Sequence, residues 1–180
     1  ALSLEDRLIA ARLLRDRSVP ERYAVLCPFT TRPQKHWIAG RWPELARQLR
    51  ATFDLPSVML GGPADRAAAD RIRRDSDGSA IDLAGAARLG QSAAILSGAA
   101  LVLGVDTGLT HMGTAFQRPT IALFGATCPY RETPSALTRV LYHHRSCSPC
   151  RRRPSCGGAF DCMAAIHPAE VLATARELLP

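Results

Sequence analysis

The chain has 180 residues, which is enough for one well-buried domain and short for two. Hydrophobic residues make up 47% of the chain and aromatic residues 6%, a composition that excludes the disordered and fibrous classes. The net charge of +7 favours anionic partners such as diphosphates, although most of the arginines are scattered, as on an ordinary solvated surface.

No apolar stretch approaches the roughly 20 residues that a membrane-spanning helix needs. The first residues lack a basic region followed by an apolar core, so no secretory signal is predicted and a cytoplasmic location is expected. The chain begins with Ala rather than Met, which indicates a processed or truncated protein.

The first 20 residues are expected to form a leading helix over 4–16, with Leu4, Leu8, Ala11 and Leu14 on its apolar face. After it, short apolar runs alternate with helical patterns. The predicted strands are 23–26, 57–60, 80–83, 101–105, 120–124 and 140–142, and the predicted helices are 43–52, 64–74, 91–96, 109–116 and 167–179.

This alternation predicts one α/β domain over residues 1–180, a doubly wound parallel sheet of Rossmann-like type with helices on both faces. In such sheets, ligands bind beyond the carboxyl ends of the strands, where helix N-termini present free N–H groups. The loops after the strands are therefore the places to look for a site.

The loop after the first strand contains Thr30, Thr31 and Lys35. Two hydroxyls and a flexible ammonium at a strand end can bind and neutralise phosphate oxygens. The alternative is an exposed polar loop that packs over Trp37.

The turn after the strand 101–105 contains Asp106, Thr107 and Gly108. Gly108 lets a ligand approach the backbone, and the N–H groups at the helix start could cradle a diphosphate, with the helix dipole behind them. His111, in the first turn of this helix, is either a further donor or a satisfied core histidine. Asp106 is also expected to act as the N-cap of the helix.

Two further loops offer single polar side chains. Asp65 follows Gly61 and Gly62, and its carboxylate suits either ribose hydroxyls or the dipole of the following helix. Thr127 follows Gly125 and is either a donor to a ligand or part of a simple turn.

Taken in order, the four loops form a pattern. Thr-Thr-x3-Lys-x-Trp from Thr30, Gly-Gly-Pro from Gly61, Asp-Thr-Gly-x2-His from Asp106 and Phe-Gly-x-Thr-x-Pro from Phe124 resemble glycosyltransferase family 9, the ADP-heptose:lipopolysaccharide heptosyltransferases. The resemblance covers residues 22 to about 178, the whole of the family's C-terminal domain.

This resemblance implies the C-terminal half of a GT-B fold, in which two Rossmann-like domains face each other across a cleft and the C-terminal one holds the nucleotide sugar. Lys35 and Asp106 would be the catalytic residues. The substrate-binding residues would be Thr30, Thr31, Lys35, Asp65, Asp106, Thr107, Gly108, His111 and Thr127.

The resemblance also implies the reaction, in which heptose moves from ADP-heptose to the lipopolysaccharide inner core. The acceptor domain and the acidic general base belong to an N-terminal domain that this chain does not contain, so the chain alone should bind donor without transferring sugar. No cofactor is expected, and the four loops contain no Asp-x-Asp pair suited to a metal–diphosphate bridge. The implied location is the cytoplasm, with room for peripheral contact at the inner membrane. The alternative function is a non-catalytic nucleotide-binding or regulatory domain of the same fold.

Four cysteines gather in a loop over 147–162, namely Cys147, Cys150, Cys156 and Cys162. Their spacing leaves zinc as an alternative, but the later intervals are short for a zinc ribbon, so reduced thiols or occasional disulfides are preferred and no metal is predicted. Similar segments occur in members of the family that resemble heptosyltransferase II. The neighbouring arginine run 151–153 lacks interleaved aromatic residues, so no nucleic-acid partner is expected.

Overall fold

The computed structural model describes residues 2–127, 129, 133, 135–150 and 153–179, and within them a single parallel sheet forms the centre of the fold. The strand order is β3-β2-β1-β4-β5-β6. The strands are β1 (Ala24–Cys27), β2 (Ser57–Met59), β3 (Ala80–Asp82), β4 (Leu101–Val105), β5 (Thr120–Phe124) and β6 (Thr138–Tyr142).

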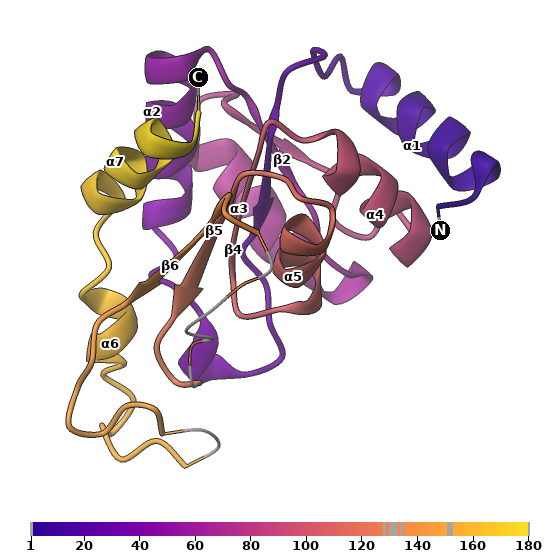
Figure 1. Ribbon diagram of the computed structural model, residues 1–180. Coiled ribbons are helices and arrows are strands. Elements are labelled where there is room, and N and C mark those ends of the chain that lie inside the picture. The colour runs from indigo at the N-terminus through magenta and orange to yellow at the C-terminus, as the bar shows by residue number, and fades with distance from the viewer. Residues whose placement is uncertain (1, 128, 130–132, 134, 151–152, 180) are drawn as a thin grey trace.

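Helices cover both faces of this sheet (Figure 1). One apolar cluster joins the sheet to α2 (Arg41–Phe53), α3 (Arg66–Asp75) and α7 (Pro168–Leu178). A second cluster joins the opposite face to α4 (Leu89–Gly98), α5 (Gly108–Ala115) and α1 (Leu4–Asp16). Neighbouring residues of β1 divide between the two clusters, because successive side chains of a strand point to opposite faces. The predicted doubly wound α/β fold is confirmed.

The structure also contains short helical segments that the sequence pattern did not reveal. These are the 3₁₀ turns η1 (Pro33–Lys35) and η2 (Pro63–Asp65), and the helix α6 (Asp161–Ala164). The predicted helix 64–74 therefore divides into η2 and α3, with a proline at the start of η2. Each segment is about one turn long, too short for an apolar periodicity to appear.

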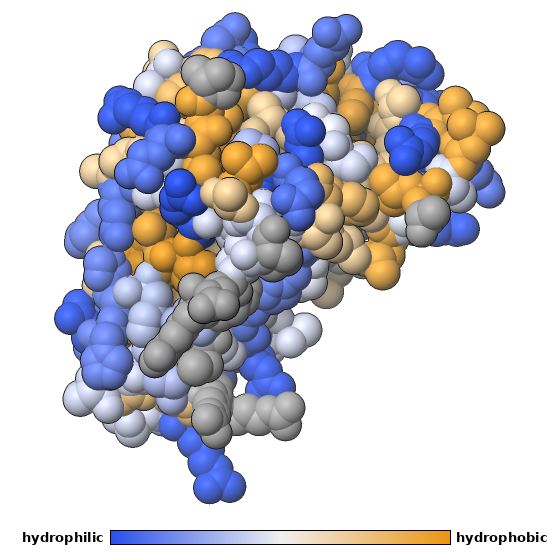
Figure 2. All heavy atoms as spheres, viewed as in Figure 1, coloured by the Kyte–Doolittle hydropathy of each residue, from blue (hydrophilic) through white to orange (hydrophobic). Residues whose placement is uncertain are grey.

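The apolar face predicted for α1 was partly wrong. Leu4 and Leu8 are 73% and 62% exposed, whereas Ala10 is buried and faces α4. Figure 2 shows apolar side chains gathered at the surface of this helix, at the upper right. In the described residues, no helix is both long and apolar enough to cross a membrane.

Gly104 is the point of closest packing beneath the loops at the carboxyl end of the sheet. A Cβ atom there would lie 2.6 Å from the Cβ of Cys27 and 2.9 Å from its carbonyl oxygen, and would also meet the hydroxyl of Thr110. We expect Gly104→Ala to lower the free energy of unfolding by about 1–3 kcal/mol through overpacking, measured by urea denaturation. Gly108→Ala is the matched control, because a Cβ there meets nothing within 4 Å. Equal losses in the two variants would contradict this account.

Candidate functional site

The strand order places a crevice between β1 and β4. At this point the order reverses, so the connections that follow the two strands run in opposite directions and leave a gap at the carboxyl end of the sheet. Lys35 ends the 3₁₀ turn η1, which follows β1, and Asp106 follows β4 directly. The fold therefore brings together two residues that lie 71 positions apart in the sequence.

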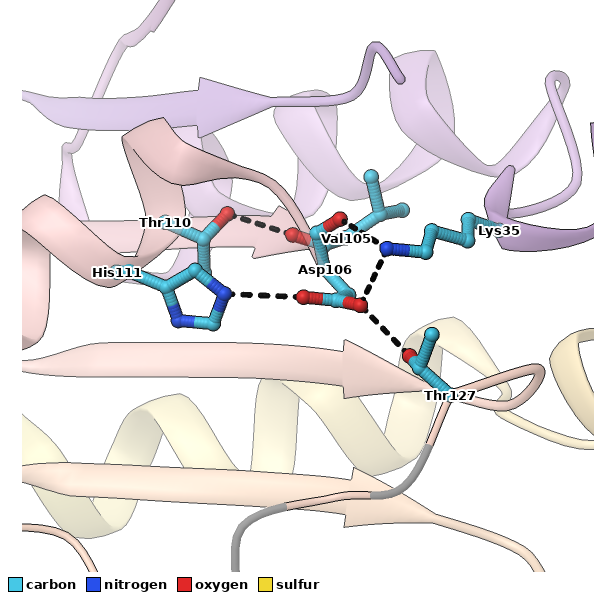
Figure 3. A network of polar contacts seen from close by, with 6 residues as sticks. All are labelled: Lys35, Val105, Asp106, Thr110, His111 and Thr127. Atoms are coloured by element: carbon cyan, nitrogen blue, oxygen red, sulfur yellow. Dashed lines mark hydrogen bonds and ion pairs between the residues drawn. The ribbon is translucent and has the colours of Figure 1, made fainter. Parts of the chain in front are cut away.

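Asp106 is the centre of a polar network (Figure 3). The Nζ atom of Lys35 donates to one carboxylate oxygen of Asp106 at 2.6 Å, and the hydroxyl of Thr127 donates to the same oxygen at 2.7 Å. The Nε2 atom of His111 lies 2.9 Å from the other oxygen. Loops after three adjacent strands, β1, β4 and β5, thus meet at one carboxylate.

These partners keep the Asp106 carboxylate charged. The hydrogen bond from His111 holds the pKa of Asp106 well below its usual range, and Lys35 and Thr127 lower it further against the opposing effect of burial. The side chains of Lys35 and Asp106 are only 17% and 14% exposed, so little water screens their pairing. Near neutral pH the group is an oriented hydrogen-bond acceptor, not an acid.

The start of α5 lies next to this network. Thr107, not Asp106, is the N-cap residue, and its side chain makes no capping hydrogen bond. The expectation that Asp106 caps the helix was wrong, because its carboxylate points toward Lys35, His111 and Thr127 (Figure 3). The first-turn N–H groups that an N-cap side chain usually satisfies therefore have no such partner in Thr107.

His111 is not the satisfied core histidine that the sequence left open as an alternative. Its side chain is 44% exposed and contacts Asp106. The turn itself is held by the hydroxyl of Thr110, which donates to the carbonyl of Val105 at 2.7 Å. Gly108 faces open space where a side chain would otherwise stand. The turn is thus closed by an internal hydrogen bond and open to a ligand at Gly108.

A cleft of about 590 Å³ opens over these residues. It is lined by six of the residues proposed from the sequence, which are Thr30, Thr31, Lys35, Asp65, Asp106 and Thr107. His111 and Thr127 are joined to it through Asp106, and Gly108 follows Thr107. The apolar part of the lining, which the sequence reasoning missed, is Phe29, Leu60, Ala64 and Leu109. Each stands next to a polar loop motif, the one signal that could have pointed to it.

Two side chains fix the walls of this cleft. The Asp65 carboxylate accepts the N–H of Gly62 at 2.8 Å and so closes the turn η2. The Nε2 atom of His36 lies 2.8 Å from the carbonyl of Thr30 and so holds the Thr30–Thr31 segment. The structure gives Asp65 a local capping role, and its predicted contact with ribose stays a prediction.

A second depression, of about 550 Å³, lies at the opposite end of the sheet. Its charged residues have partners within the chain. Arg50 pairs with Asp54 at 3.4 Å, and Arg22 donates to the carbonyl of Phe53 at 2.9 Å. Its charged groups are therefore engaged, and it lies away from the loops that carry the motifs.

All four cysteines of the segment 147–162 are described, and all are free thiols. In the described ranges, no group of three or more His, Cys, Asp or Glu side chains is arranged to hold a metal ion. The zinc alternative thus gains no support from the geometry. Two residues of the arginine run, Arg151 and Arg152, lie outside the described residues.

Comparison with known proteins gives a consistent match. The model of glycosyltransferase family 9 (heptosyltransferase) matches residues 1–159. Lipopolysaccharide heptosyltransferase 1 of Salmonella typhimurium is 36% identical over 125 residues, which cover 69% of this chain and 39% of that protein.

Solved structures agree with this match. The ADP-heptose lps heptosyltransferase II of E. coli superposes with a TM-score of 0.75 at 23% identity, over 99% of this chain and 52% of that one. E. coli heptosyltransferase WaaC, solved with ADP-2-deoxy-2-fluoro heptose, gives a TM-score of 0.65 at 27% identity, over 86% of this chain and 42% of that one. The chain thus spans about two fifths to one half of the length of these relatives. With a family model matched over most of its residues, the chain belongs to glycosyltransferase family 9, the heptosyltransferases.

Proposed function

We propose that this chain is the nucleotide-sugar-binding domain, the C-terminal half, of a GT-B heptosyltransferase that moves heptose from ADP-heptose to the lipopolysaccharide inner core. The observation that carries the proposal is the Lys35–Asp106 pair in the cleft at the switch point, beside the N-terminus of α5. The nucleotide sugar bound to the WaaC relative supports the choice of donor.

The cleft offers complementary groups for such a donor. The Lys35 ammonium and the first-turn N–H groups of α5 would bind the diphosphate, and the hydroxyls of Thr30 and Thr31 would add neutral donors. Asp65 at the cleft wall would accept bonds from the ribose. The apolar lining, including Leu60 and Leu109, would pack against the base.

The same groups would help the bond to break. As heptose leaves, negative charge develops on the departing diphosphate, and preorganised donors stabilise the transition state more than the ground state. Asp106 would orient the Lys35 ammonium and accept hydrogen bonds from the sugar, since its own protonation is strongly disfavoured. His111 and Thr127 would hold that carboxylate in place.

The remaining parts of the reaction would come from elsewhere in the full-length enzyme. The acceptor-binding surface and the acidic general base are assigned to an N-terminal domain facing this cleft, as the family resemblance implies. A cytoplasmic location with peripheral contact at the inner membrane is proposed on the same basis. Fractionation of cells that express the full-length protein tests that location.

Lys35 is the one lysine in the sequence, which makes the proposal directly testable. We expect ADP and ADP-heptose to protect Lys35 from an amine-reactive reagent, because bound phosphate oxygens would cover its ammonium. UDP and GDP should protect less. Peptide mass spectrometry reads the labelling.

Thermal shifts measured on the same samples show whether each nucleotide binds. A ligand at about 100 times its Kd should add roughly 2.7 kcal/mol of stability. Stabilisation by ADP without protection of Lys35 would place the nucleotide elsewhere and would refute the proposed site. Equal stabilisation by all the nucleotides would contradict the assignment of ADP-heptose as donor.

A further inference from the structure

A group of thiols lies behind the loop that carries Thr127. Two of these thiols belong to the segment Cys147-Ser148-Pro149-Cys150, which lies in the loop between β6 and α6 at the lower left of Figure 1. Both Cys147 and Cys150 are partly exposed. A third thiol, Cys162, is buried, and its pKa is raised by this burial and by the nearby Cys147 and Cys150.

These residues converge on Gly125. The hydroxyl of Ser148, which stands between the two cysteines, donates to the Gly125 carbonyl and is itself 3.1 Å from the hydroxyl of Tyr142. A Cβ placed on Gly125 would also lie 2.6 Å from the Sδ atom of Met163 and 2.7 Å from the Sγ atom of Cys162. Gly125 is therefore hydrogen-bonded to Ser148 and packed closely against Cys162 and Met163.

Gly125 in turn leads to the candidate site. Thr127 is two residues further along and donates to the Asp106 carboxylate at 2.7 Å. A movement of Ser148 would thus reach Asp106 through a short path, from Gly125 to Thr127. No part of this path depends on residues outside the described ranges.

We propose that Cys147 and Cys150 form a reversible dithiol–disulfide pair, and that its oxidation loosens the Thr127 loop and weakens donor binding. Two intervening residues are the spacing of redox-active cysteine pairs. The partial exposure of both thiols gives a small oxidant access, whereas Cys162 is closed off against Gly125. The effect on donor binding rests on the proposed function, but the disulfide itself does not.

The reaction is an exchange with a small-molecule disulfide such as oxidised glutathione. One cysteine thiolate attacks a sulfur of glutathione disulfide, whose S–S bond breaks, and the departing glutathione thiolate takes up a proton. The second cysteine then attacks the mixed disulfide and releases the other glutathione as a thiol. The two cysteines lose two electrons and two protons in total, and one glutathione disulfide becomes two glutathione thiols.

The new bond would strain the hydrogen bond from the Ser148 hydroxyl to the Gly125 carbonyl. A disulfide fixes its two Cβ atoms about 3.5–4.5 Å apart, so the new bond would constrain the turn of Ser148 and Pro149 on which the Ser148 hydroxyl is placed. Loss of a hydrogen bond of this kind is expected to weaken ADP binding by about two- to tenfold. Reduction should restore the affinity.

The test equilibrates the chain in mixtures of reduced and oxidised glutathione, after dialysis against a chelator. Remaining thiols are alkylated and mapped by mass spectrometry, and the Kd for ADP is measured on each sample. We expect Cys147 and Cys150 to lose alkylation together, with a link between their peptides. We also expect the higher Kd to follow the fraction of linked protein.

Cys147→Ser and Cys150→Ser should each abolish both responses, and Cys156→Ser is the matched control that should keep them. Cys156 is in the same loop, and the N–H groups of Phe160 and Gly158 lower the pKa of its thiol, so it is a reactive thiol outside the proposed pair. A different pairing would overturn the proposal. So would alkylation of a sample taken before dialysis in which Cys147 and Cys150 stay unlabelled until the chelator is added, because a bound metal would then hold them.

Failure of this proposal can be told apart from failure of the proposed function. If ADP does not bind the reduced chain, the proposed function is wrong, and the mapped link still decides whether the pair forms. Amide hydrogen exchange of the peptide 120–127 then replaces ADP binding as the readout. Unchanged exchange in the oxidised chain would refute the coupling to the Thr127 loop.

Discussion

On the proposed function, replacing Asp106 with Ala in the full-length enzyme should lower the rate of heptose transfer roughly 100-fold or more, the scale seen when a preorganised group of an active site is removed. The carboxylate accepts hydrogen bonds from Lys35, His111 and Thr127, so its loss releases three side chains at once. The affinity for ADP should change much less, because removing a negative charge from the cleft also relieves repulsion of the diphosphate.

The measurement is kcat with ADP-heptose, set beside the Kd for ADP from calorimetry. Asp106→Asn keeps the shape of the side chain and should share the loss of kcat, since a neutral amide cannot hold the Lys35 ammonium as a carboxylate does. Asp70→Asn is the matched control, because Asp70 pairs with Arg73 and Arg74 on the exposed surface of α3. Unchanged turnover in both Asp106 variants would remove this residue from the site.

Replacing Lys35 with Ala should raise the Kd for ADP and for ADP-heptose by about 10- to 100-fold. This range corresponds to the loss of one hydrogen bond to a charged group. Lys35→Arg should recover only part of the affinity, because a planar guanidinium does not reproduce the point charge of an ammonium. Titration calorimetry of the chain at a fixed salt concentration measures both effects.

The control for net charge is Arg12→Ala, which removes one positive charge from an exposed position on α1. Any loss that this variant shares with Lys35→Ala would come from long-range attraction, which added salt screens. Equal affinities in the parent and in Lys35→Ala would contradict a contact between this ammonium and the phosphates.

The regular elements could be predicted because their patterns are local. The strands β4 and β5 begin and end where the apolar runs do, since strands buried on both faces of a parallel sheet are continuously apolar. The face of α1 could not be predicted in the same way. Leu4 and Leu8 have the right spacing, but which stripe of a helix is buried depends on its neighbour, here α4.

The residues of the candidate site could be proposed, but their mutual contacts could not. Strand ends and glycines indicate where Lys35, Asp106 and Thr127 lie along the chain. That the three meet at one carboxylate depends on the order of β1, β4 and β5 in the sheet, which no single segment encodes. For the same reason Asp106 was expected to cap its helix, because the start of that helix is the only partner that the neighbouring sequence reveals for its side chain.

Assembly of the Asp106 network from loops after three strands ties ligand recognition to the completed fold. A partly unfolded chain in which β5 has detached keeps Lys35 and Asp106. It loses the hydrogen bond from Thr127 and the strand that lies beside β4 in the sheet. Such a species would gain little from nucleotide, so the donor would act as a selective stabiliser of the intact sheet. On the proposed function, the amount of folded protein in a cell would then rise and fall with the supply of the nucleotide sugar.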